Sequence, residues 1–109
     1  ESSVTVQGST TQTLKPYVYG FAVRPVITIE GSATSITVSA NGKSFGFDAF
    51  PESTIIVDGE NYRVTKNGLS YFREMTGDFI ELLPGENEVT ISGDGLNVTI
   101  KIQFRDKYA

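Results

Sequence analysis

Apolar and polar residues alternate along most of the chain, which is the pattern of a β-strand with one buried face. The clearest run is at residues 96–104, where Leu96, Val98, Ile100, Ile102 and Phe104 fall on one side of the strand. Shorter alternating runs occur at residues 4–6, 26–30, 35–39, 45–47, 55–57, 62–64 and 89–91. The pattern predicts an all-β protein, with strands from one end to the other.

Turn-forming residues fall where the alternation stops. Four dipeptides separate neighbouring runs, and each is a type that favours tight hairpins: Asn41-Gly42, Asp58-Gly59, Asn67-Gly68 and Asp94-Gly95. The segment Pro84-Gly85-Glu86-Asn87 predicts a further tight turn before the run at residues 89–91. This spacing is typical of an antiparallel two-sheet β-sandwich or a barrel. Residues 69–75 have room for at most one helical turn.

The chain length fits one domain. A domain of 109 residues buries roughly two-thirds of the surface of its unfolded chain. No linker or internal repeat interrupts residues 1–109, so we expect a single domain. The sequence starts at Glu1 without an initiator methionine or a signal-peptide pattern, and we expect it to be a piece of a longer chain.

Composition argues against catalysis and metal binding. The chain has no Cys and no His, so it lacks thiolate nucleophiles, disulfides and the commonest general base and zinc ligands. Oxygen ligands around Asp58 and Asp94 lack the spacing of an EF-hand loop. We therefore expect no enzyme activity, no catalytic residues, no metal and no cofactor.

Charge and hydropathy restrict the partners. The formal net charge is -4, and Lys and Arg are scattered singly, so no basic stripe indicates a nucleic-acid partner. No apolar run approaches the ~18 residues of a membrane span. The expected partners are proteins or sugars.

The order of motifs from Arg24 to Tyr108 resembles a known family. Arg24-Pro25 leads into an apolar strand closed by Gly31, and the hairpin at Asn41-Gly42 follows. Further on come Ile55-Ile56-Val57-Asp58, residues 62–68, and the most specific pair, Gly77-Asp78-Phe79 and Leu82-Leu83-Pro84-Gly85-Glu86-Asn87. A last strand ends in Phe104-Arg105-Asp106-Lys107-Tyr108. Together these resemble the C-terminal domain of the siphophage distal tail protein (Dit), a galectin-like, jelly-roll type β-sandwich. Residues 1–23 match poorly and are expected to form N-terminal strands or an arm.

The resemblance implies a structural role in the virion. In that family the N-terminal domain closes a ring at the phage tail tip, and the C-terminal domain projects outward from the baseplate. The chain would then be made in the bacterial cytoplasm and would dock neighbouring tail, baseplate or receptor-binding proteins. The full-length protein would form a ring-shaped homo-oligomer, and this piece alone would be a monomer.

Simple packing explains several of these residues without a partner. Asp58 is expected to cap its own turn, and Phe79, Leu82 and Leu83 are expected in the core.

The galectin-like fold also suggests an alternative, a carbohydrate-binding module for host adhesion. Galectins stack a Trp on the sugar and hydrogen-bond it through a His, and this chain has neither residue. A different sugar site would use aromatic rings in or near predicted loops, at Tyr17, Tyr19, Phe50 or Tyr71. Tyr17 and Tyr19 occupy alternate positions and could share one face, although packing on the core or on a sheet is the favoured interpretation of that pair. Tyr71 and Phe72 are equally a candidate protein-binding tip.

Overall fold

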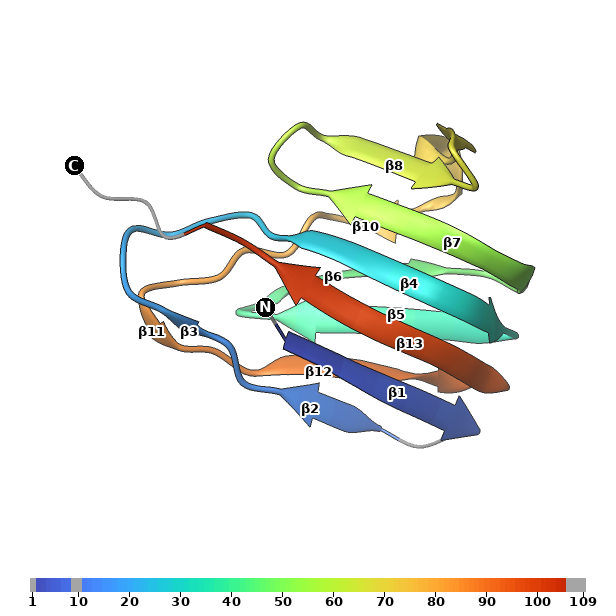
Figure 1. The fold of residues 1–109 in the computed structure, drawn as a ribbon, viewed down its shortest axis with the longest axis horizontal. Helices are drawn as coiled ribbons and strands as arrows, with labels where there is room; N and C mark the ends of the chain where they lie inside the picture. Colours follow the sequence, from blue (N-terminus) through green and yellow to red (C-terminus); the bar gives the residue numbers. More distant parts are fainter. Residues whose placement is uncertain (1, 9–10, 106–109) are drawn as a thin grey trace.

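Two antiparallel sheets face each other in the computed structural model, which describes residues 2–8 and 11–105 (Figure 1). The larger sheet has six strands in the order β1-β13-β4-β7-β8-β9, and the facing sheet has five in the order β10-β6-β5-β12-β2. Strands β3 and β11 form a separate two-stranded ribbon at one end. The predicted all-β, antiparallel two-sheet sandwich is confirmed. The elements are β1 (Ser2–Gly8), β2 (Gln12–Leu14), β3 (Tyr17–Val18), β4 (Val26–Ala33), β5 (Ser35–Ala40), β6 (Lys43–Phe47), β7 (Phe50–Asp58), β8 (Arg63–Lys66), β9 (Leu69–Ser70), η1 (Phe72–Glu74), β10 (Thr76–Gly77), β11 (Gly85–Glu86), β12 (Val89–Asp94) and β13 (Leu96–Gln103).

The core lies between the sheets and follows the alternation. In β13, the side chains of Leu96, Val98, Ile100 and Ile102 are buried, and Phe104 packs against the core at its margin. Burying one such side chain stabilises the fold by about 1.5–3 kcal/mol. Strand β13 lies between β1 and β4, so it forms the middle of the larger sheet together with β4 and β7.

Two of the predicted Asn-Gly turns are hairpins of the expected kind. Asn41 and Gly42 join β5 to β6 with φ angles of 51° and 81°. Asn67 and Gly68 join β8 to β9 with φ angles of 51° and 83°. Positive φ at both central residues defines the type I′ turn, whose twist matches that of the flanking strands.

The hairpin predicted at Asp94-Gly95 is wrong. This dipeptide joins β12 to β13, and these two strands belong to opposite sheets. Thr34 makes the other crossing beside it, between β4 and β5, and its N–H donates to the carbonyl of Asp94 over 2.9 Å. The two chain reversals are thus tied together at one end of the sandwich.

Asp58 caps its own turn, as predicted. Its Oδ1 accepts hydrogen bonds from the N–H groups of Glu60 (3.0 Å) and Asn61 (3.2 Å), and its Oδ2 accepts one from Asn61 Nδ2 (2.9 Å). The connection between β7 and β8 is nevertheless longer than the two-residue turn that Asp58-Gly59 suggests. It runs from residue 59 to residue 62, and Tyr62 adopts the positive φ of 51°.

The side chain of Asn87 organises the segment after Leu82. It is only 2% exposed, and its Oδ1 accepts hydrogen bonds from the Leu83 N–H and from Asn41 Nδ2, both over 2.8 Å. Its Nδ2 donates to the carbonyls of Leu83 (2.8 Å), Gly85 (3.0 Å) and Pro16 (3.4 Å). One buried amide therefore connects the backbone of Leu83 and Gly85, the β5–β6 hairpin and the chain entering β3. The tight turn predicted at Pro84-Gly85-Glu86-Asn87 is replaced by a bend at Pro84 and by strand β11, which pairs with β3.

This arrangement changes the expected burial of Leu83. Phe79 and Leu82 are in the core, as predicted, but the Leu83 side chain is 42% exposed. Both backbone polar groups of Leu83 bind the inward-facing Asn87 amide, and its side chain lies at the surface. The short helical turn expected within residues 69–75 is the 3₁₀ helix η1.

Candidate functional site

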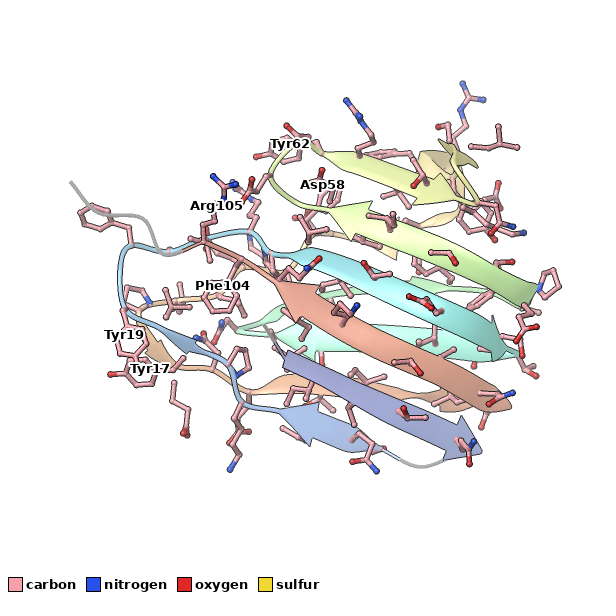
Figure 2. All side chains as sticks on the ribbon, viewed as in Figure 1. Tyr17, Tyr19, Asp58, Tyr62, Phe104 and Arg105 are labelled. Atoms are coloured by element: carbon pink, nitrogen blue, oxygen red, sulfur yellow. The ribbon has the colours of Figure 1, made fainter. Side chains whose placement is uncertain are left out.

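Tyr17 and Tyr19 form an exposed ring pair at the β3–β11 end of the molecule (Figure 2). Their ring centroids lie 4.7 Å apart with planes tilted by 48°, and the side chains are 51% and 72% exposed. Val18 between them is buried in the core. The two rings do share one side of the chain, but they lie at the surface instead of packing into the core.

Phe21 is a third exposed aromatic residue of the same short segment, and it is absent from the residues that the sequence predicts for a site. Its side chain is 57% exposed, two positions beyond Tyr19. The sequence signal that could have identified Phe21 is the spacing of three aromatic residues at positions 17, 19 and 21, with the buried Val18 between the first two. We call Tyr17, Tyr19 and Phe21 the aromatic arm. The chain that enters it is anchored at Pro16, whose carbonyl accepts a hydrogen bond from the Asn87 N–H over 3.0 Å.

Phe50 does not belong to a surface site. It begins β7 opposite Ala33 of β4, and it is 4% exposed within the core. Its neighbour Pro51 is exposed, so the strand already directs Phe50 inward at its first residue. The prediction that Phe50 belongs to a surface contact site is therefore wrong.

Tyr71 and Phe72 are neighbours with different surroundings. Tyr71 stacks on Phe47 with a centroid distance of 5.5 Å and an interplanar angle of 25°, and it packs against the core. Lys66 Nζ lies 5.0 Å from the centre of the Tyr71 ring. Burial raises the pKa of the Tyr71 hydroxyl, and the nearby Glu74 and Asp48 carboxylates raise it further. Phe72, in η1, is 46% exposed.

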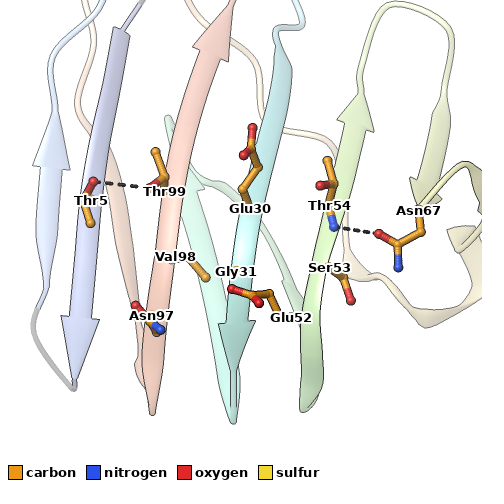
Figure 3. Close-up of a pocket in the computed structure, with 10 residues that line it drawn as sticks. All are labelled: Thr5, Glu30, Gly31, Glu52, Ser53, Thr54, Asn67, Asn97, Val98 and Thr99. Atoms are coloured by element: carbon orange, nitrogen blue, oxygen red, sulfur yellow. Dashed lines mark hydrogen bonds between the residues drawn. The ribbon is translucent and has the colours of Figure 1, made fainter.

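A polar hollow of about 480 Å³ crosses the outer face of the larger sheet (Figure 3). Hydroxyl, amide and carboxylate groups line it, from Thr5, Glu30, Gly31, Glu52, Ser53, Thr54, Asn67, Asn97, Val98 and Thr99. Two hydrogen bonds order its rim, between the Thr5 and Thr99 hydroxyls (3.3 Å) and from the Thr54 N–H to Asn67 Oδ1 (2.9 Å).

Gly31 makes the floor of this hollow flat. A Cβ at Gly31 would lie 2.0 Å from the carbonyl oxygen of Asn97, and the residue has a φ of 135°. The pairing of β4 with β7 is irregular just beyond it, between Gly31 and Ala33. Figure 3 shows the side chains of Glu30 and Glu52, from adjacent strands, beside this bare stretch of backbone.

The two surfaces present aromatic rings and polar groups. Neither the aromatic arm nor the polar hollow contains a His or Cys, because the chain has none. Among the described residues, no three carboxylates are grouped closely enough to hold a metal ion. In the same part of the chain, no helix has the length and apolarity needed to cross a membrane.

Comparison with known proteins assigns the family. Residues 20–108 match the siphovirus-type tail component, C-terminal domain, whereas no curated protein and no solved structure matches the chain. The match covers most of the sandwich and includes the Gly77-Asp78-Phe79 and Pro84-Gly85-Glu86-Asn87 motifs, and residues 1–19 lie outside it. The predicted resemblance is confirmed, and a tail component has its place in the tail of a virion. The chain therefore belongs to the siphovirus-type tail component family, as the C-terminal domain of a phage distal tail protein.

Proposed function

We propose that this domain is the outer module of a distal tail protein and that it docks neighbouring baseplate or receptor-binding proteins through the aromatic arm. Exposure of three aromatic rings on one short segment is the observation that carries the proposal. Tyr and Phe each offer on the order of 150–250 Å² of surface to bury. Aromatic residues are also enriched at the centres of protein interfaces, and Tyr is among the commonest hot-spot residues.

The arm is preorganised for such a contact. Tyr17 and Tyr19 already pack against each other, and the Asn87 N–H holds the preceding Pro16 carbonyl. Few further rotatable bonds of the arm have to be ordered when a partner binds, so the entropic cost of binding is lower than for a flexible segment.

Site-specific photo-crosslinking in assembled tails tests this function. A photoreactive phenylalanine at position 19 of the full-length tail protein is expected to form an adduct with a neighbouring tail protein after irradiation. The matched control places the same group at Thr37, which is exposed on the outer face of the five-stranded sheet. Adducts at position 19 with none at 37 support docking through the arm, whereas an unmodified protein at position 19 argues against it.

A carbohydrate-binding role is the second candidate. The polar hollow supports it, because carboxylate and amide groups such as those of Glu30, Glu52 and Asn97 hydrogen-bond readily to sugar hydroxyls. The exposed Tyr17–Tyr19 pair supplies ring faces for stacking. A glycan array tests the idea, and the variants Glu52→Gln and Tyr19→Ala tell the two surfaces apart by which of them loses binding. Absence of specific glycan binding excludes this role.

The proposal extends to assembly. Residues 1–109 are one domain of a longer chain, which forms a ring of identical subunits, while this domain alone is monomeric. Light scattering on the isolated domain and on the full-length protein checks both statements. An isolated domain that forms rings would contradict the assignment of ring closure to the rest of the protein.

A further inference from the structure

A second exposed aromatic surface lies far along the chain from the arm, where β8 and β9 meet η1. A hollow of about 390 Å³ opens there, and its lining residues are Tyr62, Arg63, Val64, Thr65, Ser70 and Phe72. We call it the Tyr62–Phe72 hollow. Val64 is buried, whereas Tyr62 and Phe72 are 56% and 46% exposed. Leu69, in the adjoining β9, is 74% exposed.

The two rings of this hollow share one support. Phe79 is in the core, and its ring centroid lies 5.5 Å from that of Tyr62, edge-on at 84°, and 5.9 Å from that of Phe72. Aromatic pairs at these distances stabilise each other in addition to the area they bury. Both rings are therefore fixed before any partner arrives.

Tyr62 is held in an unfavourable backbone conformation. Its φ of 51° lies in the left-handed region, which bulky residues rarely adopt. The cap formed by Asp58 fixes the loop that leads to it (Figure 2). Strain of this kind persists where the surrounding structure imposes it, and it is concentrated at functional sites. Here the strained residue carries an aromatic ring that contacts Phe79 and is still 56% exposed.

Two arginines lie beside the hollow although the domain as a whole is acidic. The chain has four arginines and a net charge of -4, and two of the four, Arg24 and Arg63, lie at this hollow. Arg24 Cζ lies 5.3 Å from the centre of the Tyr62 ring, and Arg63 lines the hollow.

Acidic residues also lie near these arginines. Asp58 accepts the hydrogen bonds of its own turn and is the cross-strand neighbour of Arg63. Glu60 lines a different hollow, next to Arg105. Arg24 and Arg63 thus place guanidinium groups beside the hollow, and arginine forms bidentate pairs with carboxylates.

We propose that the Tyr62–Phe72 hollow receives an apolar side chain of a partner protein, presented by a segment whose flanking residues are Asp or Glu. The apolar side chain packs between the Tyr62 and Phe72 rings over Val64. The flanking carboxylates pair with Arg63 and Arg24. This surface is distinct from the aromatic arm, so the inference stands or falls independently of the proposed function.

Selection from a random heptapeptide library against the domain tests the proposal. We expect enriched peptides to share an aromatic or large aliphatic residue flanked by acidic residues. Their affinity should fall at least about tenfold in Phe72→Ala and in Arg63→Gln. It should be unchanged in Tyr19→Ala, which alters the aromatic arm alone and serves as the matched control.

The variant Tyr62→Asn separates binding from folding. Asparagine tolerates the left-handed region, so relief of strain compensates for the lost contact with Phe79, and we expect a melting temperature within about 3 °C of the parent domain. Peptide affinity should nevertheless fall at least about tenfold.

Any of the following results would overturn the proposal. The selection enriches no peptide, or it enriches peptides that lack acidic residues. The enriched peptides bind Tyr62→Asn as tightly as they bind the parent domain. The proposal would also be overturned if the domain forms a concentration-dependent dimer that the substitution Tyr62→Asn dissociates, because the hollow would then bind a second copy of the domain.

Discussion

The buried amide of Asn87 offers the most direct test of what holds this sandwich together. The variant Asn87→Ala removes an acceptor and a donor that together reach Leu83, Gly85, Pro16 and Asn41. Alanine leaves the backbone free to keep its conformation, so the change isolates the side-chain hydrogen bonds.

The expected loss follows from these contacts. Three bonds of 2.8 to 3.0 Å, with the N–H of Leu83 and the carbonyls of Leu83 and Gly85, contribute about 1 kcal/mol each on a typical scale. The Leu83 N–H also loses its acceptor, which adds to the cost where water cannot reach it. We expect the free energy of unfolding to fall by about 3 kcal/mol or more. A domain of this size then loses roughly 12–18 °C of melting temperature, at about 4–6 °C per kcal/mol.

Urea unfolding of the isolated domain measures this loss, with the dependence on urea concentration unchanged between variants. Asn61→Ala is the matched control, because its exposed amide makes one side-chain bond, to Asp58 Oδ2. This variant should change the free energy of unfolding by no more than about 0.5 kcal/mol. An Asn87→Ala variant that loses less than about 1 kcal/mol would refute the reasoning. Asn87→Asp sharpens the test, since it keeps the acceptor but places a carboxylate oxygen against the carbonyls of Leu83 and Gly85, and it should be at least as destabilising at neutral pH.

The other predictions concern backbone clearance, core packing and ionisation. Gly31→Ala should destabilise the domain by about 3 kcal/mol or more, because the new Cβ would lie 2.0 Å from the Asn97 carbonyl oxygen. Gly68 has open space around it, so Gly68→Ala should lower the free energy of unfolding by only about 1 kcal/mol, because alanine disfavours the positive φ of this position. Urea unfolding measures this difference. Ile100→Ala in the middle of β13 should cost about 2–5 kcal/mol by the same measurement, and a smaller loss would mean that the core closes around the cavity. The raised pKa of Tyr71 means that the folded state keeps this proton to higher pH than the unfolded state. Its contribution is complete below the ordinary tyrosine pKa of 10.0 and is lost as pH rises through the folded value, so Tyr71→Phe should flatten the alkaline fall of stability.

The local sequence pattern is sufficient to predict a residue's place in the fold wherever that place depends on its immediate neighbours. The alternation in β13 identifies both the strand and its buried face, and Asn41-Gly42 identifies a type I′ hairpin, because side-chain direction and turn type are properties of a few adjacent residues. Asp94-Gly95 carries the same local signal, but it connects opposite sheets. Which strand β13 joins is decided by pairing with β1 and β4, which are distant in sequence.

The surfaces depend still more on distant contacts. Phe50 and Tyr19 are both aromatic residues near predicted turns, yet one is in the core and the other is largely exposed. Their positions relative to the opposite sheet determine this difference, and no local pattern encodes it. The alternation at residues 62–64 predicts an inward Tyr62, whereas the four-residue loop after Asp58 presents its ring at the surface in a left-handed conformation.

The central position of β13 has a consequence for how the domain is made. Its partners β1 and β4 are synthesised long before it, so the larger sheet lacks its middle until the ribosome has released residues up to Gln103. Until then β1 has no hydrogen-bonded neighbour in that sheet, and the inner residues of β4 are only partly covered. The fold therefore has many long-range contacts, which makes folding slow. A chain cut within β13 would expose open strand edges on both sides of the gap, and such edges favour aggregation over assembly.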